Sequence, residues 1–181
     1  DRLRADKYWI ETLPRDKFVV AYTGMIGQTI ELEPIFDAAP ELPGVWFVFC
    51  GGGDGLEAAK QEVAKRGLAN VLFTGWLKTP EIQRVLQLAD VGLVPYRDRA
   101  NFETGVTNKP VEYLANSLPI LTSLQRGVLV DLLRESRTGA TYRNTEPKEL
   151  VQILNGWSSN PDPSMPEKAR RLFDENFHPD I

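Results

Sequence analysis

The sequence has little of the side-chain chemistry on which many enzymes depend. Cys50 is the one cysteine and His178 the one histidine among 181 residues. A disulfide within the chain is therefore excluded, and a reducing compartment is the simpler setting. A histidine cluster for a metal and a local Ser/His/Asp triad are not available within this chain. No apolar run is long enough to span a bilayer.

The usual phosphate-binding motifs are also missing. Gly51–Gly55 follows an apolar run and opens a helical pattern, but Leu56 stands where the dinucleotide fingerprint needs its third glycine. No glycine is followed by Lys and then Ser or Thr, as the Walker A pattern requires. We interpret these glycines as a tight strand-to-helix turn. Gly24 and Gly27 follow an earlier run, where they fit either close approach to a ligand or a flexible loop.

What is present is the composition of one ordinary globular domain. Hydrophobic residues make up 42% of the chain and charged residues 25%, which is enough to build a core. The net charge of −4 disfavours a nucleic-acid partner, because such partners are usually met by a basic face. Cys50 ends the apolar run Val45–Cys50, so we expect a buried thiol rather than a nucleophile.

Short apolar runs alternate with amphipathic segments along the chain. The runs are typical of buried parallel strands and lie at Phe18–Tyr22, Val45–Cys50, Val71–Phe73, Val91–Val94, Pro119–Thr122 and Ala140–Tyr142. Helical patterns lie at Gly55–Arg66, Thr79–Ala89, Val128–Glu135, Glu146–Trp157 and Pro166–Phe173. The helix after Thr79 is expected to use that residue as its N-cap. This alternation predicts an α/β, Rossmann-like three-layer domain with a parallel sheet, spanning 18–181 after a lead-in at 1–17.

Ligands of such sheets bind beyond the carboxyl ends of the strands, which directs attention to the loops there. The richest of them lies within Pro95–Leu121 and contains Arg97, Arg99 and Lys109. Glu112 is expected in the first turn of a short helix, where its two oxygens can accept the hydroxyls of a ribose. Lys109 can offset phosphate charge. The residues alone fit equally well a carboxylate that complements the helix dipole and a solvated lysine.

One segment resembles the signature helix of retaining GT-B glycosyltransferases of family four (group 1), of the bacterial O-antigen and exopolysaccharide type. That segment is Asn108–Leu121, which reads NKPVEYLANSLPIL. Further blocks stand in the family's order along the chain. FVVAYTGMIG, WFVFCGGGDG, NVLFTGWL and ADVGLVPY lie before this segment, and FDENF lies after it. The resemblance covers nearly the whole chain after residue 17, and it implies the C-terminal, donor-binding half of the GT-B fold.

The resemblance also implies roles for particular residues. Glu112 matches the second acid of a Glu, seven residues, Glu motif and would bind the donor ribose, whereas the first acid is replaced by Thr104, with Glu103 one residue away. The first glycine loop, with Gly27 and Gln28, lacks the Arg and Lys that many members use to neutralise the diphosphate; Lys109, or Arg97 and Arg99, would supply that charge. The other implied donor contacts are Gly105, Val106, Thr107 and Asn108 to the diphosphate or sugar, and Trp76 and Leu77 to the base.

The implied reaction transfers a sugar from a nucleoside diphosphate to a glycan or lipid-linked acceptor, with retained configuration. The resemblance implies no cofactor and no metal. We expect the chain to be one half of a longer cytoplasmic protein, with the acceptor site and any contact to the inner membrane face on the N-terminal domain. Such a fragment alone would bind nucleotide weakly and turn nothing over.

Two alternatives remain open. The first is a non-catalytic module that kept the GT-B fold and lost the site, which the missing first acid favours. The second is a nucleotide-sugar 2-epimerase of the same architecture, against which the lone histidine counts. The base, sugar, acceptor and oligomeric state are not specified by the sequence.

Overall fold

The computed structural model describes residues 16–97 and 102–178, and it confirms the predicted Rossmann-like α/β fold. Six parallel strands form one sheet in the order β3-β2-β1-β4-β5-β6. The strands are β1 Phe18–Thr23, β2 Val45–Cys50, β3 Val71–Gly75, β4 Val91–Val94, β5 Ile120–Thr122 and β6 Gly139–Thr141. The order reverses between β1 and β4, so a crevice is expected beyond their carboxyl ends. Of the lead-in at 1–17, residues 1–15 lie outside the described part of the chain.

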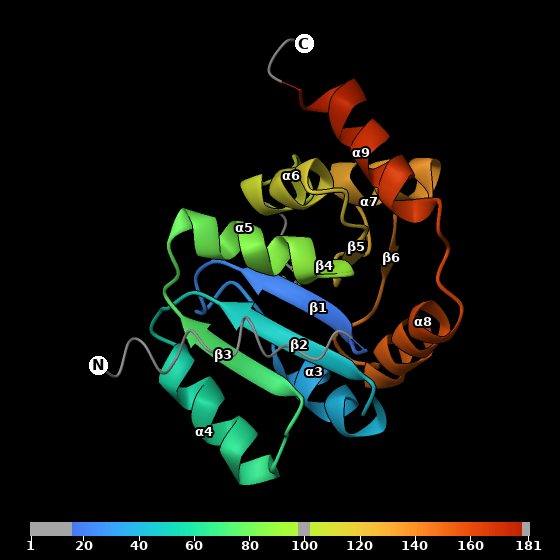
Figure 1. Cartoon of the computed structure of the whole chain (residues 1–181). Coiled ribbons are helices and arrows are strands. Elements are labelled where there is room, and N and C mark those ends of the chain that lie inside the picture. Colours follow the sequence, from blue (N-terminus) through green and yellow to red (C-terminus); the bar gives the residue numbers. More distant parts are fainter. Residues whose placement is uncertain (1–15, 98–101, 179–181) are drawn as a thin grey trace.

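Helices cover both faces of this sheet (Figure 1). On one face lie α3 Glu33–Ala38 with the short η1 Ala39–Glu41, α4 Leu56–Arg66 and α8 Pro147–Ser159. On the other lie α5 Thr79–Leu88, α6 Asn108–Ala115, α7 Val128–Ser136 and α9 Met165–Asn176. This division follows from right-handed crossovers, because the path of the chain across the sheet changes direction after β3. No helix in the described ranges is long and apolar enough to cross a membrane.

The central strands are buried on both faces, which explains why they read as unbroken apolar runs. Val20 and Tyr22 of β1 belong to the main core, while Val19 and Ala21 pack with Val85 of α5 in a smaller layer. Successive side chains of a strand point to opposite faces, so one strand serves both layers. Cys50 lies in the smaller layer and is 2% exposed, as expected of a core thiol.

Two local features differ from the sequence predictions. The segment α3 was not expected; it begins with Glu33 and Pro34, and its Ile35 and Phe36 are buried. The N-cap of α5 is Lys78 rather than Thr79, because the backbone N–H of Lys78 donates to the Glu81 carboxylate at 2.7 Å. Proline tolerates either of the first two helical positions, so the sequence left this boundary one residue uncertain.

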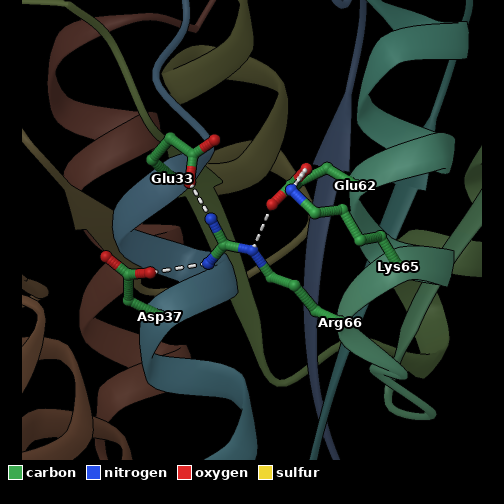
Figure 2. A network of polar contacts seen from close by, with 5 residues as sticks. All are labelled: Glu33, Asp37, Glu62, Lys65 and Arg66. Atoms are coloured by element: carbon green, nitrogen blue, oxygen red, sulfur yellow. Dashed lines mark hydrogen bonds and ion pairs between the residues drawn. The ribbon is translucent and has the colours of Figure 1, made fainter.

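A polar network ties α4 to α3 (Figure 2). The guanidinium of Arg66 lies 2.6 Å from the carboxylate of Asp37 and 2.7 Å from that of Glu62, and it also pairs with Glu33. Three carboxylates around one cation raise its pKa, first through the hydrogen bond with Glu62. The network fixes the two helices that follow β1 and β2 and the loops after these strands.

Candidate functional site

Two glycine loops lie side by side where β1 and β2 end. The backbone N–H of Gly24 donates to the Cys50 carbonyl at 2.8 Å, and that of Ile26 donates to the Gly52 carbonyl at 2.8 Å. Gly51 has a φ of +142°, and a Cβ there would overlap the carbonyl of Gly24. Gly53 stands in the same relation to the carbonyl of Ile26. The glycines of 51–55 thus serve a strand-to-helix turn that packs against the first loop, as interpreted from the sequence.

Lys109 of α6 reaches the first of these loops. A Cβ on Gly24 would overlap the Lys109 side chain, and the Nζ atom lies 5.6 Å from the centre of the Tyr22 ring. Loss of hydration lowers the pKa of this half-buried ammonium, while the nearby Glu112 carboxylate raises it. Lys109 therefore places a partly desolvated positive charge beside the first glycine loop, and such a charge suits an anion.

Glu112 is held by the end of β1. The hydroxyl of Thr23 donates to its carboxylate at 3.2 Å, and the backbone N–H of Thr23 donates to the Tyr113 hydroxyl at 2.9 Å. Glu112 is the fifth residue of α6 and lies in its second turn, not in the first turn as predicted. Thr23 was not among the predicted site residues; its place at the carboxyl end of a central strand is the signal that could have identified it.

Tyr113 fixes the position of α6 on the sheet. Its side chain is fully buried, and its ring occupies the space above Gly92 of β4 that any larger residue would fill. The pKa of its hydroxyl is raised by burial. Because Lys109 and Glu112 lie on the same helix, the packing of Tyr113 on Gly92 sets where both of them lie.

The segment that leads into α6 contains the remaining predicted diphosphate contacts. Thr104 and Gly105 are exposed, and Val106 packs partly against the core. The hydroxyl of Thr107 lies 2.7 Å from that of Tyr96. Asn108 is the first residue of α6 and is exposed.

The predicted arginines are not equivalent to Lys109. Arg97 forms an ion pair with Glu31 at 3.0 Å and donates to the carbonyl of Ile30 at 3.1 Å. Its charge is already matched, and it joins the segment after β4 to the one before α3. Arg99 lies outside the described residues.

Two apolar side chains are exposed at the same edge of the sheet. Trp76, after β3, is 74% exposed, and Met25, in the first glycine loop, is 62% exposed. The Trp76 ring lies against Gly52, where a Cβ would overlap it. The neighbouring Leu77 packs partly under α5. Gln28 is exposed, while Gly27 is half-buried beside Asp54.

A cleft of about 350 Å³ opens beside Gly27, between α3 and α4. Glu31, Glu33 and Glu62 contribute to its wall. These carboxylates are paired with Arg97 or Arg66, so the nearby cations are already matched by acids and the cleft does not suit a diphosphate.

The described ranges contain neither a candidate metal site nor a reactive thiol. No group of three or more His, Cys, Asp or Glu side chains that could hold a metal ion occurs there. Burial raises the pKa of the Cys50 thiol to about 12. A thiol with such a pKa is not ionised at neutral pH and is a poor nucleophile.

The strand order, with its reversal between β1 and β4, defines a class of protein, the Rossmann-like α/β domains with a parallel sheet. Residues 4–176 match the model of the family described as glycosyl transferases group 1. The chain belongs to this family. No curated protein sequence matches it significantly.

Solved structures support the same fold. Anabaena HepE in complex with UDP has a TM-score of 0.75 at 19% identity, with 96% of this chain and 49% of that one covered. A sucrose-phosphate synthase from Thermosynechococcus elongatus has a TM-score of 0.75 at 20% identity, covering 94% and 44%. The C-terminal domain of a group 1 glycosyl transferase, LpcC from Francisella tularensis, has a TM-score of 0.70 at 16% identity, covering 95% and 92%. The chain thus spans about half the length of HepE and nearly all of an isolated C-terminal domain.

Proposed function

We propose that this chain is the donor-binding half of a retaining glycosyltransferase that takes its sugar from a uridine diphosphate. The observation that carries the proposal is the pairing of Lys109 and Glu112 on α6, with the first at the glycine loop and the second on Thr23. The solved relative HepE was crystallised with UDP and with UDP-glucose, which supports the choice of base.

In this proposal each part of the donor has its own partner. Glu112 offers carboxylate oxygens to the ribose hydroxyls while Thr23 fixes its orientation. Lys109 and the backbone N–H groups of 105–108 face the diphosphate, in place of the Arg and Lys that the first glycine loop lacks. The exposed ring of Trp76 offers a flat surface on which a base can stack.

The chemical step breaks the bond between the anomeric carbon and the diphosphate oxygen and forms one to an acceptor oxygen on the same face. The acceptor hydroxyl passes its proton to the departing diphosphate oxygen, and Lys109 stabilises the negative charge that remains on the diphosphate. In line with the family resemblance, the proposed transfer uses no metal ion. The acceptor, a glycan or lipid-linked sugar of a bacterial O-antigen or exopolysaccharide, would bind to a separate N-terminal domain. The domain alone is therefore expected to be inactive, in a protein that works in the cytoplasm or at the inner membrane face.

Titration calorimetry with UDP, GDP and ADP tests the proposal. We expect UDP to bind most tightly and Lys109→Met to weaken it about ten-fold, since a charge-assisted contact is lost. Lys60→Met is the matched control, because Lys60 is an exposed α4 lysine paired only with Glu57 in the described contacts. Equal binding by Lys109→Met and the unchanged protein would refute the role of Lys109.

A second candidate function is a non-catalytic GT-B-like module. It is favoured by Thr104, which replaces the first acid of the motif, and by the uncharged Met25–Gln28 loop. Failure of the chain to bind any of the three nucleotides would support this candidate over the transferase.

A further inference from the structure

The segment Phe102–Thr107, here called the donor loop, is held at both ends by one side chain. The ring of Phe102 stacks on that of Tyr96, with centroids 4.2 Å apart and an interplanar angle of 18°. The Tyr96 hydroxyl also lies 2.7 Å from the hydroxyl of Thr107, at the other end of the donor loop. Tyr96 is buried, so both anchors rest on a fixed point at the end of β4.

A separate anchor holds Glu103 against the start of α7. The carboxylate of Glu103 lies 2.9 Å from the guanidinium of Arg126. Its carbonyl accepts from the backbone N–H of Val128 at 3.1 Å. Gly127 has a φ of +102°, and a Cβ there would lie 2.5 Å from the Glu103 carbonyl oxygen, so only glycine allows this approach.

The carboxylate of Glu103 is thus committed to the fold. The Glu103 side chain is 22% exposed, and pairing with the Arg126 guanidinium lowers the pKa of the carboxyl group. Glu103, the acid next to Thr104, therefore pairs with Arg126. Thr104 and Gly105 lie between the anchors and are exposed.

We propose that Glu103 and Arg126 are positioning residues that hold the donor loop in the shape that receives the diphosphate. This inference rests on the proposed function, since it assumes that the backbone of 104–107 faces the donor. A loop that is ordered before binding does not have to be ordered by the ligand, and affinity gains accordingly. Because the Arg126 side chain is 74% exposed, this ion pair alone contributes little to stability, and its effect is expected in ligand affinity rather than in unfolding.

The test compares UDP with uridine, which lacks the diphosphate. Glu103→Gln and Arg126→Gln are each expected to weaken UDP binding about five-fold, with uridine binding unchanged, since the loop faces the phosphates alone. Asp131→Asn is the control, because Asp131 forms an exposed pair with Arg134 on the same α7. The exchanged pair, Glu103→Arg with Arg126→Glu, is expected to regain most of the UDP affinity.

Hydrogen exchange of the ligand-free protein separates this inference from the proposed function. The amides of 104–107 are expected to exchange several-fold faster in Glu103→Gln and Arg126→Gln, while those of β1 keep their rates. Unchanged exchange and unchanged UDP affinity in both variants would overturn the inference. If the unaltered protein binds no nucleotide but the exchange rates rise, the proposed function fails and the anchor itself stands.

Discussion

The two glycine loops and the donor loop lie at the same edge of the sheet but are held mainly by different groups. The glycine loops bond to each other through backbone groups and need the absence of side chains at Gly51 and Gly53. The donor loop and α6 are held by side chains, through Tyr96, Glu103 and Tyr113. The difference teaches that glycines after a strand can serve the packing of two loops, while in the proposed site the ligand is recognised by the polar side chains opposite them.

The largest expected effect comes from filling the space between the glycine loops. Gly51→Val combines a φ of +142° with an overlap on the Gly24 carbonyl. We expect it to lower the free energy of unfolding by about 4 kcal/mol, from backbone strain and overpacking together. Urea denaturation measures this change. Gly44→Ala is the control, since a Cβ there meets nothing within 4 Å. A stable Gly51→Val protein would show that the loops can separate.

The next effect concerns α6, the helix that carries Glu112. Glu112→Gln keeps an oxygen for the Thr23 hydroxyl but loses the charge, so we expect UDP affinity to fall about 10- to 100-fold with little change in stability. Calorimetry checks the affinity. Glu57→Gln, an exposed acid of α4, is the control. Retained affinity would move ribose recognition away from α6.

Tyr113→Phe tests how far α6 depends on a single hydroxyl. The buried N–H of Thr23 would lose its acceptor, and we expect the free energy of unfolding to fall by about 2 kcal/mol. Chemical denaturation gives this value, and the ring that packs on Gly92 is kept. A loss near zero would mean that ring packing alone holds α6.

A smaller effect is expected for the network beside the glycine loops. Arg66→Met removes the contacts to Glu33, Asp37 and Glu62, all of them partly solvated, so we expect a loss of only about 1 kcal/mol. Arg134→Met, which removes one exposed pair of α7, is the control and should change less. The comparison would be weakened if Arg66→Met proved as damaging as Gly51→Val.

The smallest effect separates the two regions by pH. Arg126 lowers the folded-state pKa of Glu103, so the contribution of this pair is present above the ordinary pKa of about 4.3 and is lost as the pH falls through the lowered value. The backbone bonds of the glycine loops do not titrate. A carboxyl NMR titration should give Glu103 a pKa below its ordinary value, and Arg126→Gln should raise that pKa. An unshifted Glu103 would contradict the ion pair.

The strands were predictable because each is an apolar run buried on both faces. The helix α3 was not, because Glu33–Ala38 is too short to show a helical period, and its Ile35 and Phe36 are buried by tertiary contacts. Of the candidate site, Lys109 and Glu112 were singled out by residue type, by spacing and by the family resemblance. Thr23 stands at a strand end that the sequence marks, but its contact with Glu112 could not be predicted, since it depends on which strand end lies under α6.

Asn70 shows a further limit of sequence reading. Its side-chain amide lies within 3.0 Å of three backbone carbonyls, those of Ala39, Leu42 and Val45. It forms part of a recognisable block, Asn70–Leu77, yet nothing in its neighbours along the chain reveals that it caps a turn 25 or more residues earlier. The positions of Arg97 and Glu103 were equally hidden, because ion pairs between distant loops leave no periodic signal.

Gly92 gives the fold an unexpected point of control. It lies in the middle of β4, meets no ligand in the proposed site, and is needed only because the Tyr113 ring rests on it. Even a single added methyl group there would push α6 outward and carry Lys109 and Glu112 away from the glycine loop. A substitution at Gly92, far from the proposed ligand contacts, is therefore expected to lower the affinity of the protein for the donor.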